Sequence, residues 1–130
     1  LEASASQHRY TVLITQSHED PVREQRLLDT MLRNRVDGLI IAATTQTYKT
    51  DFVSRFDALG IPVVFLMRNA RDRSRYSVTN DSFNGSRQAV TYLIQNGHRR
   101  IAHLRGPYSL VISQLRHEGY QQALQDNGIE

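Results

Sequence analysis

This sequence contains no cysteine, so the side chains most able to take part in binding or catalysis are its histidines and arginines. Its five histidines lack the spacing of a metal site, so no metal is expected. They are His8, His18, His98, His103 and His117. The glycine-rich loops that hold phosphates or dinucleotides do not occur, nor does the elbow that presents a catalytic serine. No nucleophile can be paired with a base, so an enzyme has the least support, and no cofactor is expected.

Arginine carries almost all of the positive charge. Lys49 is the single lysine, and the balance of 16 basic against 13 acidic residues gives a net charge of +3. The arginines are spread along the chain, whereas a DNA-binding surface gathers them on one face. We interpret the basic stretch of Arg68, Arg71, Arg73 and Arg75 as a solvated loop. The charge pattern therefore gives little support for direct contact with DNA.

Apolar runs alternate with amphipathic stretches, and this alternation predicts an α/β fold. Short runs rich in β-branched residues predict strands at residues 10–15, 36–43, 62–66, 76–79 and 101–104. Helices are predicted at residues 1–7 and after Asp20, Asp51, Asn80 and Pro107. Because each strand is nearly continuous in apolar residues, we expect a parallel sheet with helices on both faces.

The order of these elements predicts that the chain is part of a larger protein. It begins with a helix, whereas a right-handed crossover begins with a strand. After Asn80 only one strand lies between two helices, and sheets of fewer than about three strands are rarely stable. We therefore expect a strand before Leu1 and further strands after Glu130.

Residues that could bind a ligand follow the predicted strands. Asp81, Met67 and residues 110–116 each come after a strand, so they are expected at one edge of the sheet. Open parallel sheets bind ligands at that edge. His18 lies in a turn at the same edge; it either belongs to the cap of the next helix or contacts the ligand.

Residues 78–129 carry the most specific pattern in the chain. The pattern comprises Asp81, Gly85, Ala89, Leu93 and Gly97, then His98-Arg99-Arg100-Ile101-Ala102, Gly106-Pro107, Arg116, Gly119-Tyr120, Ala123-Leu124 and Gly128-Ile129. Residues 36–41 and 60–64 add two further landmarks upstream. In this pattern the chain resembles, over essentially its whole length, the effector-binding domain of the LacI/GalR family of bacterial transcriptional repressors.

The resemblance implies a fold of two lobes, similar to periplasmic sugar-binding proteins, with a small-molecule effector (a sugar or related metabolite) between them. Residues 1–80 would form the N-terminal lobe without its first strand, and residues 81–130 the start of an incomplete C-terminal lobe. A headpiece absent from this chain would bind operator DNA. The expected protein is a cytoplasmic, homodimeric repressor and not an enzyme. No membrane partner is expected, because the sequence holds neither a membrane span nor a signal peptide.

Within that resemblance, Arg116 matches the arginine that donates to effector oxygens, and Asp81 lies at the first crossing between the lobes. A guanidinium offers five donors in a fixed geometry, which suits vicinal hydroxyls or a carboxylate. The alternative is that Arg116 only pairs with Asp81 or another carboxylate across the lobes.

Three positions of the expected site depart from the family pattern. Met67 stands where the family often has an acidic residue, and Leu110 and Ile112 stand where sugar-binding members have small polar residues. Each sugar hydroxyl left unpaired there would cost about 1–3 kcal/mol. A plain monosaccharide such as galactose is therefore not expected, and a larger, less polar or differently oriented effector is. The alternative for Met67 is packing in the core.

The main alternative to a repressor is a periplasmic solute-binding protein of a transporter, which shares the fold and the cleft. An upstream helix-turn-helix would favour the repressor, and an upstream export signal would favour the solute-binding protein. The compact pattern around Gly97 and Arg116 favours the repressor.

Overall fold

The computed structural model describes residues 1–44, 46–47, 51–68 and 76–129. The chain divides into two compact units, residues 1–36 and residues 37–130, and each is described by itself. The boundary between these units, after residue 36, differs from the lobe boundary expected near Asn80. That lobe boundary stays a prediction. Part of the predicted basic loop, residues 69–75, lies outside the described residues.

The first unit contains two helices, α1 (Glu2–Gln7) and α2 (Pro21–Arg33). Asp20 caps α2 as predicted: its Oδ1 accepts from the backbone N–H groups of Val22 at 2.9 Å and Arg23 at 3.2 Å. The strand predicted at residues 10–15 is not formed, and Ile14 is 82% exposed. An apolar run becomes a strand only where another strand completes its hydrogen bonds, and the described residues provide none here.

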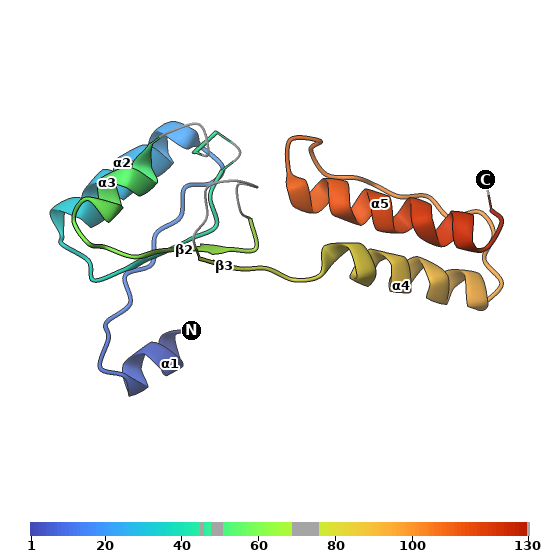
Figure 1. Ribbon diagram of the computed structural model, residues 1–130, viewed down its shortest axis with the longest axis horizontal. Coiled ribbons are helices and arrows are strands. Elements are labelled where there is room, and N and C mark those ends of the chain that lie inside the picture. The colour runs from blue at the N-terminus through green and yellow to red at the C-terminus, as the bar shows by residue number, and fades with distance from the viewer. Residues whose placement is uncertain (45, 48–50, 69–75, 130) are drawn as a thin grey trace. The chain divides into compact units, whose positions relative to one another are not determined.

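The second unit begins with a parallel sheet, as the sequence predicts. Strands β1 (Leu39–Ile41), β2 (Val63–Leu66) and β3 (Ser77–Val78) lie in that order, and helix α3 (Phe52–Asp57) connects β1 to β2 (Figure 1). Leu39 is in register with Val63, and Phe65 with Ser77. The carboxyl ends of all three strands therefore lie at one edge.

An aromatic cluster fixes α3 on this sheet. Phe52, Phe56 and Phe65 are fully buried. The ring centroid of Phe52 lies 6.3 Å from that of Phe56 and 6.0 Å from that of Phe65. The opposite side of the sheet is less covered, since Ile40 remains 49% exposed.

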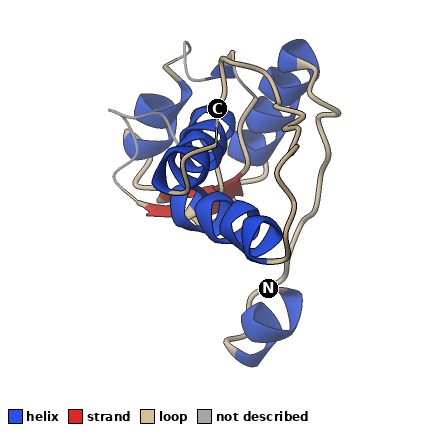
Figure 2. Ribbon diagram, turned by 90° about the vertical axis from the view of Figure 1, so that its right-hand side faces the viewer, coloured by secondary structure: helices blue, strands red, loops and turns tan. Residues whose placement is uncertain are grey.

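Helices α4 (Ser82–Gln95) and α5 (Val111–Asp126) lie side by side and run in the same direction (Figures 1 and 2). Val90, Ile94 and Ala123 form a buried cluster between them. Gly97 ends α4 as predicted, with a φ of 88° that favours glycine, while the His98 N–H donates to the Leu93 carbonyl at 3.1 Å.

The segment between these helices is not a strand, although one is predicted at residues 101–104. No described strand pairs with it, and Leu104 is 98% exposed. Ile101 still packs against the buried cluster, and its carbonyl accepts from the Tyr120 hydroxyl at 2.8 Å. The segment is therefore held by α5.

Gly119 allows the two helices to approach closely. A Cβ at this position would overlap the carbonyl oxygen of Phe83 and lie 3.1 Å from the backbone nitrogen of Arg87. The atoms in the way are backbone atoms, so they cannot rotate aside. Arg87 also reaches across to α5, where its Nη2 lies 2.6 Å from Asp126 Oδ2.

We predict that Gly119→Ala lowers the free energy of unfolding by about 1–3 kcal/mol, because the methyl group forces α4 and α5 apart. Gly85→Ala is the matched control, since nothing lies within 4 Å of a Cβ there. This helical position should gain about 0.5–1 kcal/mol from alanine. Urea denaturation monitored by circular dichroism measures both. Equal stability of the two variants would contradict the close contact at Gly119.

Candidate functional site

The candidate site includes Asp81. It lies at the end of the segment that follows β3, and it caps the N-terminus of α4. Its Oδ1 accepts from the backbone N–H of Asn84 at 3.0 Å, and its Oδ2 accepts from Asn84 Nδ2 at 2.7 Å. These bonds, that of the Asn84 side chain first, hold the pKa of the exposed Asp81 carboxyl below its usual value. Asp81 therefore presents a fixed negative charge at the N-terminus of α4.

Arg116 reaches the same place from α5. The Ser86 hydroxyl donates to the Arg116 carbonyl at 2.7 Å and so ties the two helices together. Arg116 is exposed, and its guanidinium forms no ion pair or hydrogen bond with any described residue. The described residues therefore show no pairing of Arg116 with Asp81 or with another carboxylate.

Asp81 and Arg116 line one open pocket of about 310 Å³. All of its lining residues except Gly85 have polar side chains; they are Asn80, Asp81, Ser82, Gly85, Ser86, His103 and Arg116. A carboxylate that only accepts and a guanidinium that only donates line this space, together with two hydroxyl groups whose hydrogens are donated to Asn80 and to the Arg116 carbonyl. Such a set can bind a small molecule rich in hydroxyl groups.

His103 is one of the lining residues that the sequence did not predict. It lies on the segment between the helices, and its ring stacks on Tyr120 with centroids 5.0 Å apart. Its Nδ1 lies 3.4 Å from Nδ1 of His117. Burial lowers the pKa of His103, and the charges of His117 and Arg105 lower it further. The sequence places His117 and Tyr120 on one helix face with the spacing i, i+3, but it does not place His103 beside them.

The other expected site residues lie outside the lining of this pocket. Met67 follows β2 with a φ of 61° and is 47% exposed, so it does not pack in the core. Leu110 caps α5 without a side-chain hydrogen bond, and Ile112 is half-buried in the first turn of that helix. His18 belongs to the first unit, where it is exposed in a turn with a φ of 55°. Effector contacts from these residues remain predictions.

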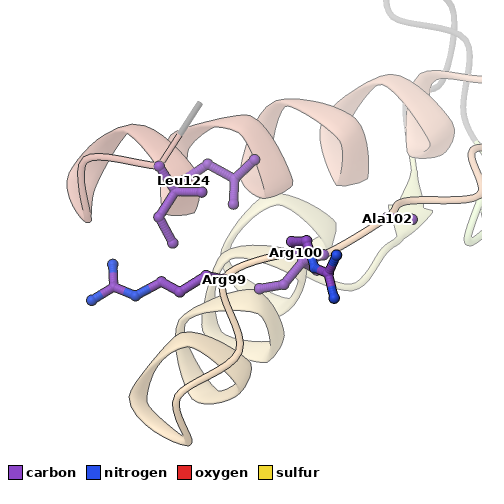
Figure 3. Close-up of a pocket in the computed structure, with 6 residues that line it drawn as sticks. Arg99, Arg100, Ala102 and Leu124 are labelled. Atoms are coloured by element: carbon purple, nitrogen blue, oxygen red, sulfur yellow. The ribbon is translucent and has the colours of Figure 1, made fainter.

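A second open pocket, of about 330 Å³, lies at the far end of α5 (Figure 3). Arg99, Arg100, Ile101 and Ala102 line it from the segment between the helices, and Leu124 and Ile129 from α5 and the residues after it. Ile101, Leu124 and Ile129 pack against the buried cluster of α4 and α5. This pocket lacks the acceptors of the first, so it is a weaker candidate for binding a polar effector.

The described residues include neither a group of metal ligands nor a helix suited to a membrane. No three histidine, aspartate or glutamate side chains among them are grouped to hold a metal ion. Of the described helices, none has the length and apolar character needed to cross a membrane.

Comparison with known proteins relates the whole chain to one family. The family model of periplasmic binding proteins and the sugar-binding domain of the LacI family matches residues 1–130. The HTH-type transcriptional regulator GntR of Escherichia coli is 33% identical over 99% of this chain and 38% of its own length. The ribose operon repressor of the same species is 30% identical over 99% of this chain and 39% of its own length.

A solved structure shares the fold of this chain. The Cra transcriptional dual regulator of Pseudomonas putida, crystallised with fructose 1-phosphate, superposes with a TM-score of 0.86 and 29% identity. The match covers 99% of this chain and 47% of that one. The chain thus spans less than half the length of these relatives. The α/β fold and the family resemblance predicted from the motifs around Asp81 and Arg116 are confirmed: the chain belongs to the family of periplasmic binding proteins and LacI-type sugar-binding domains.

Proposed function

We propose that this chain is the effector-binding and dimerisation region of a LacI-type transcriptional regulator. A small molecule binds between two lobes, of which residues 1–80 form the first and residues 81–130 begin the second. A headpiece outside this chain binds operator DNA. The names of the relatives, which are regulators of transcription, support this function over transport of a solute.

The observation that carries the proposal is the pocket shared by Asp81 and Arg116. The Arg116 guanidinium is free to donate to effector oxygens, and the Asp81 carboxylate accepts from effector hydroxyls. Met67, Leu110 and Ile112 add apolar contacts, and His18 adds a polar one. The chain performs no chemistry on the bound molecule.

Effector binding changes the affinity for operator DNA by changing the arrangement of the two lobes. An effector that binds one lobe arrangement more tightly shifts the protein toward it, and operator affinity changes by the same coupling free energy, about 1–3 kcal/mol. The regulator acts in the cytoplasm as a homodimer, because a two-fold dimer matches a palindromic operator.

We predict that Arg116→Ala weakens effector binding about 10- to 100-fold, since it removes hydrogen bonds from a charged donor worth about 1.5–3 kcal/mol. The effector is first identified by thermal-shift screening of sugars and sugar derivatives on the intact protein. Calorimetry then gives the affinities. Arg99→Ala, at the second pocket, is the control and should bind normally. Normal affinity in Arg116→Ala would remove this residue from the effector site.

A second prediction separates the two roles of Asp81. Asp81→Asn keeps a residue that caps helices well, so stability should change little. Effector affinity should fall about tenfold, because a carboxylate that accepts from a ligand hydroxyl is lost. Asp20→Asn makes the same exchange at the cap of α2 and should leave affinity unchanged. Equal effector affinity in the two variants would show that Asp81 is a cap and nothing more.

A further inference from the structure

The two histidines near the pocket meet edge to edge. Their ring planes differ by 11° and their centroids lie 5.6 Å apart. The distance between the two Nδ1 atoms is only 3.4 Å. It is shorter than the distance between the ring centroids by nearly the width of one imidazole ring. Both nitrogens therefore lie on the line between the ring centres, which is the arrangement of an N–H···N contact.

This contact accommodates a single proton on the two facing nitrogens. The facing nitrogens share at most one hydrogen, which one Nδ1 donates and the other accepts, because two hydrogens at this separation would collide. Protonating the second ring would also bring two positive charges together. As long as the contact holds, the pair carries at most one positive charge.

The charged groups around His103 determine which class of ligand would favour protonation of the histidine pair. His117 and Tyr120 face it from α5, Arg105 lies two residues along its own segment, and Asp81 and Arg116 share its pocket. With a neutral histidine pair, the charges of Asp81 and Arg116 cancel. One added proton makes the Arg116 side of the pocket doubly positive, while Asp81 on α4 still accepts hydrogen bonds.

We propose that this pocket takes a polyhydroxylated anion, with its carboxylate or phosphate against Arg116 and His103 and its hydroxyls toward Asp81, and that the His103–His117 pair takes up one proton from solvent on binding. The proposal rests on the proposed function, since it names the class of effector for the same pocket. It departs from the expectation of a less polar effector, because the lining is polar.

The sign of the pH dependence follows from the free protein. Burial first, and then the charges of His117 and Arg105, lower the pKa of His103, so its ring favours the neutral form in the free protein. A bound anion favours the charged form and raises that pKa. Affinity for an anion therefore increases as pH falls through the pKa of the complex. It stops increasing below the pKa of the free protein. The total change is about tenfold for each unit by which the anion raises the pKa.

The test uses radiolabelled sulfate as probe, because its own charge is constant across the pH range. Binding to the intact protein is measured by equilibrium dialysis at constant ionic strength, in steps from about pH 8 down to about pH 5.5, on either side of the ordinary histidine pKa. Saturable binding should strengthen several-fold toward low pH in the wild type. His103→Gln should bind with an affinity that no longer depends on pH, and Arg116→Ala should lose the binding.

His8→Gln is the matched control, since His8 is an exposed histidine of the first unit and should keep the wild-type pH dependence. Circular dichroism verifies that each variant is folded. Competition separates the two anion chemistries at one carbon of one sugar: glucose 6-phosphate or glucuronate should displace sulfate, and glucose should not. Absence of saturable sulfate binding would overturn the proposal, as would an unchanged pH dependence in His103→Gln.

The failure of this inference differs from the failure of the proposed function. If sulfate does not bind but Arg116→Ala still abolishes the response of operator binding to a neutral effector, the effector site stands and its anionic character falls. If Arg116→Ala leaves that response intact, the proposed function falls as well.

Discussion

The close contact between α4 and α5 at Gly119 is the constraint on which the site depends. Backbone of α4 occupies the space that a side chain at this position would need. This proximity lets Ser86 bond to the Arg116 carbonyl and brings the cap of α4 and the guanidinium of Arg116 to one pocket. The small core of Val90, Ile94 and Ala123 lies between the same two helices. Packing and ligand chemistry therefore share one interface.

Opposite charges remain unpaired across this pocket, and that makes it suitable for binding. The Asp81 carboxylate is satisfied by Asn84, so its charge is stabilised locally. Arg116 has no such partner among the described residues. The pocket thus offers a fixed acceptor and a free donor, and His103 adds a group whose charge depends on its neighbours. A ligand that supplies both hydroxyls and negative charge would complete the set.

Local interactions were predictable from the sequence, and long-range ones were not. The cap at Asp20 and the helix end at Gly97 rest on residues close in the chain, and both are confirmed. The prediction of a strand at residues 101–104 was wrong, because a strand needs a second strand to complete its hydrogen bonds and the amino-acid composition does not supply one. Asp81 and Arg116 line one pocket, and the effector contacts expected of them stay predictions. His103 was missed because its contacts to His117 and Tyr120 depend on how the segment packs on α5.

The central claim is that the effector binds at the pocket between the N-terminus of α4 and Arg116. Hydrogen–deuterium exchange of the intact protein, with and without its effector, tests this most directly, because bound ligand slows the opening of the backbone that it contacts. The account predicts slower exchange in residues 80–86 and in the first turns of α5 through Arg116. Slower exchange confined to residues 99–102 and 124–129, around the second pocket, would contradict it.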